Sequence, residues 1–369
     1  MHFVALILPS TMAYKFLKFL AISVSIFTIS CDNNFKLSSV EKSYARGFEA
    51  YTGERWSKCI DHFEETLHLF KLFKSTLTNC RLKCNSQLYA SSIDGDIEDL
   101  KVYELFFNKR NCLDKCQEIG FGSVHIPKES DYGLLSSMEA RKPYEYLHVC
   151  YFQMYMLPKA ASAAYTYLVA HLKDDVMRNN LKYYMEQPEV DINEVVNLES
   201  ESFEELYKIG IKSYKESKWE KTVTSMEEVL TDYMSWENRC RAECEYGQEQ
   251  EWSPEMVKTV SNYMASLLRC KQRCQNKLLS HNYSSGFEFL ADILNYLQIS
   301  YYHMGRFDEA ARVVSSFLLL KPDDEDMLQN KDIYSTLTDS VEFVERPDIL
   351  YYYKRDNYEK KLVADFLGD

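Results

Sequence analysis

The sequence contains few of the residues that form turns. Among its 369 residues there are 11 glycines and 8 prolines, which disfavours a turn-rich β fold and favours helices. Basic residues are also in the minority, since the net charge is −13. A protein whose main partner is nucleic acid needs a basic face for the phosphates, so this composition argues against that class. Hydrophobic residues make up 46% of the chain, which is enough for a large core.

Long apolar runs are missing too, apart from one near the N-terminus. There, Lys15 and Lys18 are followed by the apolar run FLAISVSIFTIS (19–30). A basic start and a short apolar run are typical of a secretory signal peptide, so we expect residues 1–30 to be one. An uncleaved membrane anchor is the alternative, although the run is short for a membrane span. The mature chain is therefore expected in the secretory pathway, where disulfides persist.

Cysteine occurs in a repeated spacing. Eight of the 11 cysteines form four C-x-x-x-C segments: NCRLKC (79–84), NCLDKC (111–116), RCRAEC (239–244) and RCKQRC (269–274). In a helix, residues i and i+4 lie on one face, so each segment places two sulfurs along one helix edge. Two antiparallel helices that carry such segments can be joined twice. The spacing therefore predicts the disulfides Cys80–Cys116 and Cys84–Cys112 in a first hairpin, and Cys240–Cys274 and Cys244–Cys270 in a second.

Two other uses of these cysteines compete with disulfides. Four thiolates can bind zinc, but structural zinc sites usually have C-x₂-C spacing, and an oxidising compartment removes the thiols. Redox catalysis usually employs C-x-x-C at a helix start near a βαβ unit, and the sequence contains no such unit. Structural disulfides are the preferred interpretation.

Three cysteines lie outside this spacing. Cys31 lies at the expected cleavage site, so it either leaves with the signal peptide or becomes the new N-terminal residue. Cys59 and Cys150 both fall in apolar helical runs. We expect Cys59 and Cys150 to be buried free thiols, which behave as small hydrophobic residues, rather than a fifth bridge.

The surroundings of the cysteines repeat as well. GFEAYTGERWSKCIDHFEETL (47–67) matches GIKSYKESKWEKTVTSMEEVL (210–230), and YEYLHVCYFQMYMLPKAASAAYTYL (144–168) matches LNYLQISYYHMGRFDEAARVVSSFL (294–318). Such matches indicate an internal repeat of about 150–160 residues. We expect a first half over residues 37–198, a second half over residues 199–345, and a C-terminal helical tail over residues 346–369.

Each half contains helix pairs similar to tetratricopeptide repeats. The clearest is YYHMGRFDEAARVVSSFLLLKPDD (301–324). It has Gly305 at the turn and Ala310 where two helices approach closely. In the tryptophan-containing pairs, Cys59 and Thr222 occupy the alanine position.

An aromatic stripe at helical spacing is most often part of a core. We therefore interpret Trp56, Trp219 and Phe307 as core residues. The predicted fold is all-α, with tandemly duplicated tetratricopeptide-like repeats and two disulfide-stapled helical hairpins. Arrays of this kind present a concave surface and usually serve as binding scaffolds.

The combination of these features resembles the leprecan family. The resemblance rests on the N-terminal signal, the tyrosine- and tryptophan-containing helix pairs such as YTGERW (51–56), the closing segment KPDDEDM (321–327), and the four C-x-x-x-C segments in two sets. It covers residues 40–345. The four cysteine pairs together are its most specific part.

Some leprecans carry an iron- and 2-oxoglutarate-dependent hydroxylase domain. Its metal site requires an H-x-D sequence and a distant histidine. None of the eight histidines begins H-x-D: they are His2, His62, His68, His125, His148, His171, His281 and His303. The sequence continues for only a short stretch beyond the second half, so we expect no such domain. The resemblance thus implies a short, non-catalytic member with no cofactor and no metal.

The resemblance implies a helper or scaffold subunit in the endoplasmic reticulum lumen. Such subunits assemble with a collagen prolyl 3-hydroxylase and a cyclophilin-type prolyl isomerase, and the complex acts on unfolded procollagen chains. The concave surface would hold the partner or the substrate. Aromatic faces suit proline rings, but the preferred interpretation of the many tyrosines is that they are core and ordinary surface residues. Alternatives are an independent collagen chaperone or matrix adaptor, a scaffold for collagen lysyl modification, and an oxidoreductase that uses the cysteine pairs.

Smaller features complete the prediction. Asn282 in NYS is an N-glycosylation sequon in an expected loop. The tail reads as one amphipathic helix, for which capping of the last repeat is preferred over docking a partner. The last residues are not a K-D-E-L signal, so retention would depend on a partner, and secretion is the alternative.

Overall fold

The computed structural model describes residues 37–87, 100–123, 129–245, 254–278, 283–337 and 343–367, and their regular structure is helical throughout. The expected signal peptide, Cys31 and Asn282 lie outside these residues. The helices are α2 (Leu37–Thr52), α3 (Trp56–Ser86), α4 (Leu100–Phe121), α5 (Glu129–Glu139), α6 (Lys142–Gln153), α7 (Leu157–Ala170), α8 (Asp175–Met185), η1 (Ile192–Glu194), α9 (Ser202–Lys215), α10 (Trp219–Glu243), α11 (Met256–Cys274), α12 (Gly286–His303), α13 (Phe307–Leu320), α14 (Glu325–Leu337) and α15 (Pro347–Leu367). Within the described ranges, no helix has the length and apolar character needed to cross a membrane.

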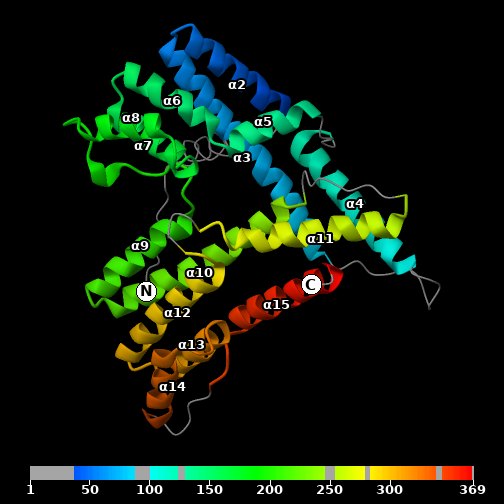
Figure 1. The fold of residues 1–369 in the computed structure, drawn as a ribbon, viewed down its shortest axis with the longest axis vertical. Coiled ribbons are helices and arrows are strands. Elements are labelled where there is room, and N and C mark those ends of the chain that lie inside the picture. The colour runs from blue at the N-terminus through cyan, green and yellow to red at the C-terminus, as the bar shows by residue number, and fades with distance from the viewer. Residues whose placement is uncertain are drawn as a thin grey trace, which may run out of the picture.

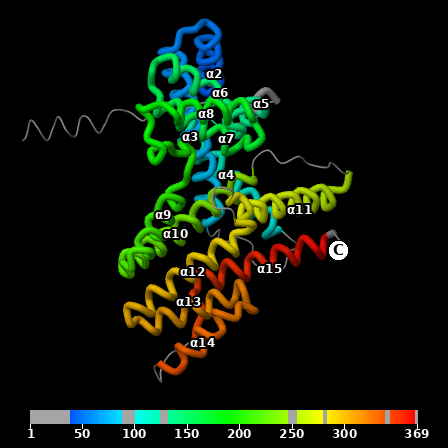
Figure 2. The backbone as a smooth tube through the Cα atoms, turned by 60° about the vertical axis from the view of Figure 1, so that its left-hand side comes forward, coloured from blue at the N-terminus to red at the C-terminus, as the bar shows by residue number. Residues whose placement is uncertain are grey.

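The same succession of helices occurs twice, apart from α5, which lies between α4 and α6 and has no counterpart in the described part of the second half (Figure 1). In the first half, the pair α2–α3 is followed by α4, the pair α6–α7 and the closing helix α8. In the second half, the pair α9–α10 is followed by α11, the pair α12–α13 and the closing helix α14. The predicted tandemly duplicated all-α fold is therefore confirmed. The long helix α3 runs from the first half to the hairpin helices of the second, so the halves are joined through it (Figure 2).

Each helix pair turns through a residue in the left-handed region. These residues are Glu54 (φ 53°), Tyr155 (φ 57°), Ser217 (φ 55°) and Gly305 (φ 73°). In every case the next amide donates a hydrogen bond of 2.9 Å to a carbonyl five residues earlier, as Arg306 does to Tyr301. This closure satisfies a carbonyl at the end of the first helix. Glycine marks this position in only one of the pairs, which is why the turn is obvious from the sequence only at Gly305.

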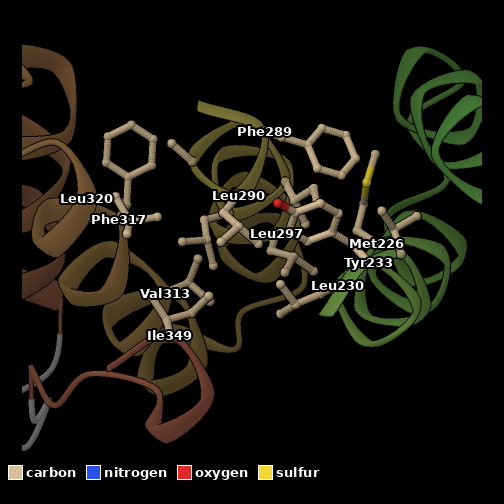
Figure 3. Packing of buried hydrophobic residues seen from close by; sticks show 14 of the residues in the cluster. Met226, Leu230, Tyr233, Phe289, Leu290, Leu297, Val313, Phe317, Leu320 and Ile349 are labelled. Carbon is tan, nitrogen blue, oxygen red and sulfur yellow. The ribbon is translucent and has the colours of Figure 1, made fainter. Parts of the chain in front are cut away.

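Each half has its own buried core. In the second half, side chains of α10 pack against α12, and α13 and α15 close the other side (Figure 3). The labelled residues are Met226, Leu230, Tyr233, Phe289, Leu290, Leu297, Val313, Phe317, Leu320 and Ile349. Ala160 and Ala310 are fully buried in the two halves, as expected for the position where paired helices approach closely.

Two disulfides join the helices of each hairpin. The structure contains Cys80–Cys116, Cys84–Cys112, Cys240–Cys274 and Cys244–Cys270, with Cα–Cα distances of 5.7, 5.8, 5.9 and 5.8 Å. These are the pairs that the i, i+4 spacing predicts. The outer bridge of a hairpin stabilises it by about 4 kcal/mol if the effect is mainly the lost entropy of the unfolded chain.

A fifth disulfide corrects the prediction for Cys59 and Cys150. These two residues are bonded to each other, with a Cα–Cα distance of 6.3 Å, and are not free thiols. Both are fully buried where α3 packs against α6. They are 91 residues apart in the chain, so no local spacing reveals the pairing. At the equivalent positions the second half has Thr222 and Ser300, which are also fully buried.

The two halves contact each other through their C-x-x-x-C segments. Arg81, between Cys80 and Cys84, donates from Nη1 to the carbonyl of Ala242, between Cys240 and Cys244, at 3.0 Å. Lys74 forms an ion pair of 2.9 Å with Glu243, and Asn85 donates to Glu245 at 3.0 Å. The Arg81 side chain is buried, so its guanidinium depends on these carbonyl partners. The junction is thus built from the segments that the disulfides brace.

Helix α15 packs across α11 and α13. Glu237 of α10 is buried and receives two hydrogen bonds from Arg355, of 2.8 and 2.9 Å. Burial raises the pKa of Glu237, while the guanidinium of Arg355 opposes this rise. Gln275 donates to Asp356 at 2.7 Å. The tail therefore contacts the last repeat, as a cap would, but it also covers the second disulfide hairpin, which was not predicted.

The equivalence of the two cores predicts that the fifth disulfide can be copied. In the double variant Thr222→Cys and Ser300→Cys, we expect a disulfide to form, because these positions correspond to Cys59 and Cys150. Their hydroxyls bond only to carbonyls of their own helices, at 3.1 and 2.7 Å, so little is lost. The free energy of unfolding should rise by about 2–4 kcal/mol.

Intact mass and alkylation of the unreduced protein measure whether the bond forms, and chemical denaturation measures the gain. Each single cysteine variant serves as control. Two alkylated thiols in the double variant would show that the cores differ at this position.

Candidate functional site

An aromatic row lies on the first half, on the side formed by the first helix of each pair. Its members are Phe48 and Tyr51 of α2, Trp56 at the start of α3, and Tyr146 of α6; we call this row the first ladder. Ring centroids are 5.5 Å apart for Phe48 and Tyr146, and 5.1 Å for Tyr51 and Tyr146. Tyr51 contacts Trp56 at 6.1 Å, edge to face. Such edge-to-face contacts fix the rings and leave their outer edges accessible.

The second half carries the corresponding row. Tyr214 of α9, Trp219 at the start of α10, and Tyr296 and His303 of α12 form the second ladder. Centroids are 4.9 Å apart for Tyr214 and Tyr296, and 5.6 Å for Tyr214 and Trp219. His303 stacks on Trp219 at 4.2 Å. Three of the four positions are equivalent in the repeat, so the duplication preserved the arrangement as well as the residues.

The prediction that Trp56, Trp219 and Phe307 are core residues holds in part for Trp56 and not for the other two. Trp56, Trp219 and Phe307 are each partly exposed. Among them, only Trp56 packs against the buried core of its half. The reason is their place in the fold: all three begin the second helix of a pair, next to the turn, where one part of the ring is not covered by a neighbouring helix.

Tyrosines around the ladders donate hydrogen bonds to carboxylates. The pairs are Tyr144–Glu199 (2.5 Å), Tyr151–Glu64 (2.6 Å), Tyr301–Glu227 (2.9 Å), Tyr283–Asp292 (2.6 Å) and Tyr207–Asp292. Burial, followed by the neighbouring carboxylate, raises the pKa of Tyr144 and Tyr301 well above the ordinary value. These hydroxyls remain neutral donors at physiological pH. Much of the tyrosine content therefore has a structural use.

A hydrogen bond between α6 and α8 is repeated with a different residue in the second half. His148 of α6 is buried, and its Nδ1 lies 3.0 Å from the hydroxyl of Tyr184. At the equivalent positions, Tyr334 donates to the side-chain oxygen of Gln298. Burial lowers the pKa of His148 to about 4, although Glu145 and Asp174 act in the opposite direction. The imidazole is therefore neutral in the folded protein at physiological pH.

The described residues contain no group of three or more histidine, cysteine, aspartate or glutamate side chains that could hold a metal ion. Ten cysteines in this part of the chain are in disulfides. The predicted site residues thus fall into two sets: the eight cysteines, which the structure brings together in hairpins, and Asn282, which lies outside the described residues. Sequence reasoning missed the second member of each ladder contact, Tyr146 and Tyr296, which only the packing of first helices reveals.

Comparisons with known proteins agree with this architecture. The Leprecan family TPR-like repeat region matches residues 39–338. Cartilage-associated protein of Mus musculus is 27% identical over 337 residues, which are 89% of this chain and 83% of that protein. Endoplasmic reticulum protein SC65 of Homo sapiens is 28% identical, over 81% of this chain and 70% of that protein. Prolyl 3-hydroxylase 1 of Rattus norvegicus is 28% identical over 93% of this chain, which spans 50% of the hydroxylase.

The His148–Tyr184 contact predicts a specific dependence of stability on pH. Because the pKa is lower in the folded state, the unfolded state binds the proton first as the pH falls below the ordinary value of 6.5. The neutral imidazole's contribution is thus complete above that value and is lost as the pH falls toward about 4. Between about pH 7 and about pH 5 the loss amounts to about 2 kcal/mol.

In the variant His148→Gln, which copies the second half, we expect this part of the acid sensitivity to disappear. The reverse variant, Gln298→His, should gain it. Denaturant unfolding measured across the pH range tests both. Parallel stability profiles for His148→Gln and the unaltered protein would contradict the assignment.

Proposed function

Because the chain belongs to the leprecan family, we propose that it is a non-enzymatic scaffold subunit that assists a prolyl 3-hydroxylase acting on collagen chains. The chain matches most of the length of cartilage-associated protein and of SC65, and half the length of prolyl 3-hydroxylase 1. The match is to a TPR-like repeat region, and arrays of helical repeats usually serve as binding scaffolds, which supports a role in binding. The name of SC65 includes the endoplasmic reticulum, which supports the lumen of that organelle as the place of action.

The two ladders carry this proposal. An extended, proline-rich chain presents rings at regular intervals and has little conformational entropy to lose on binding. Tyrosine and tryptophan edges held in fixed positions are suited to contact these rings. Since one ladder lies on each half, a single long chain could be held at two points. Simultaneous contact at two points increases the overall affinity without any new contact.

A second surface supports the binding of a folded partner. The first half of α4 leaves large apolar side chains exposed: Val102 (49%), Tyr103 (48%), Phe106 (50%) and Phe107 (63%). Together with Leu100, they expose roughly 500 Å² of mostly apolar surface on one side of the helix. A standard protein interface buries about 800 Å² per partner, so this surface supplies a large part of one. We assign it to the hydroxylase, because proline-rich chains are better matched by the ladders.

The ladders predict the behaviour of tryptophan variants. For Trp56→Ala or Trp219→Ala, we expect a synthetic proline-rich peptide to bind roughly tenfold more weakly, as for loss of a central aromatic contact. Fluorescence anisotropy of the labelled peptide measures the dissociation constant. Tyr358→Ala on α15 is the matched control, since Tyr358 is 64% exposed and far from both ladders in the chain. Unchanged affinity in both tryptophan variants would show that the ladders are not the binding site.

The α4 surface predicts the outcome of a co-purification experiment. The tagged protein, isolated from secretory cells, should carry a prolyl 3-hydroxylase and a cyclophilin-type isomerase. The double variant Phe106→Ser and Phe107→Ser should lose the hydroxylase, because both rings would leave the interface. The control, Met256→Ser and Val257→Ser, changes the corresponding end of α11, where the two side chains are 64% and 72% exposed. Recovery of collagen chains without a hydroxylase would instead indicate an independent chaperone. Recovery of lysyl-modifying enzymes would indicate a scaffold for collagen lysyl modification.

A further inference from the structure

The two ladders are alike in their rings but differ in the charges beside them. On α9, Lys208, Lys212 and Lys215 each follow a residue of the ladder side, Tyr207, Ile211 and Tyr214, by one position. All three lysines are exposed and, being spaced by four and three residues, form one stripe next to the aromatic stripe. A binding partner that contacts Tyr214 therefore passes beside these ammonium groups.

The first half has no such stripe. The equivalent positions on α2 are Ala45, Glu49 and Thr52. Glu49 forms an ion pair of 2.9 Å with Arg55, so even its single charge is balanced. The lysine stripe is thus a property of the second half alone and does not follow from the repeat.

The lysines are largely available to a ligand. Lys208 pairs with Glu205 at 2.7 Å. Neither Lys212 nor Lys215 forms an ion pair with another described residue. The chain as a whole has a net charge of −13, so three lysines in one stripe stand out against an acidic surface. The stripe has one acidic neighbour, Glu216, whose pKa is lowered mainly by Lys218 and to a smaller extent by Lys212 and Lys221. Beyond the turn, Trp219 lies between Lys218 and Glu220, and Lys221 follows.

We propose that the second ladder, together with Lys212 and Lys215, selects proline-rich segments that carry aspartate or glutamate. This inference rests on the proposed function, since it assumes that the ladders bind proline-rich chains. The aromatic rings would contact prolines, and the lysines, one helical step away, would meet acidic side chains of the same segment. The first ladder, with no unpaired charge on its stripe, would accept neutral segments. Each half of the repeat would then hold a different kind of segment in one client chain.

The experiment compares three labelled peptides of equal length and proline content that carry glutamate, glutamine or lysine at the same two positions. With the full chain, we expect the glutamate peptide to bind about threefold to tenfold more tightly than the glutamine peptide, and the lysine peptide to bind most weakly. Added salt should reduce the difference, because the charges are exposed. Anisotropy titrations measure all three dissociation constants.

The double variant Lys212→Glu and Lys215→Glu should reverse this order. The matched control, Lys354→Glu and Lys361→Glu, makes the same change in net charge on exposed positions of α15. In this control the original order of the three affinities should remain. Equal affinity of the three peptides, or a glutamate preference that survives in the Lys212 and Lys215 variant, would overturn the inference and leave the proposed function intact. If none of the peptides bound, both would be overturned.

Discussion

The contact between the two C-x-x-x-C segments is the constraint on which the arrangement of the halves depends. Arg81 reaches the carbonyls of Ala242 and Glu243 from within a turn of helix that two disulfides hold. The recipient carbonyls lie within a turn that two other disulfides hold. A buried guanidinium that is left without hydrogen-bond acceptors destabilises the folded protein, so both segments must keep their positions. The disulfides of the two hairpins therefore also determine how one ladder lies relative to the other.

In the two ladders, the residues that hold the aromatic rings in place are different from the residues that determine which ligand is preferred. The residues that position the rings are kept in both halves: Tyr51 and Tyr214, Trp56 and Trp219. Neighbouring positions, where side chains point to solvent, have diverged in charge. Since exposed charges contribute little to the stability of the fold, they can change without disturbing the packing. The same backbone can thus present two different surfaces to a ligand.

The features predictable from the sequence are those governed by local periodicity. The i, i+4 spacing of cysteines led to four disulfides, and the internal match led to the duplicated helical array. Features that depend on packing between distant segments were not predictable in this way. Cys59 and Cys150 meet only because α3 packs against α6, and the two residues looked like isolated apolar positions. Equally, helical periodicity shows that Trp219 lies on an aromatic stripe, but it does not show that the stripe is left partly uncovered.

The unequal cross-linking of the two halves has a mechanical consequence. Cys59–Cys150 encloses most of the first half in one covalent loop, with a sequence separation of 91 residues, whereas the longest loop among the described bridges of the second half spans 34. A force that stretches the chain cannot lengthen a segment inside a closed loop. Under tension from a long, growing polypeptide, residues 59–150 of the first half could not be drawn out, whereas in the second half the described bridges protect only the shorter segment of the disulfide hairpin.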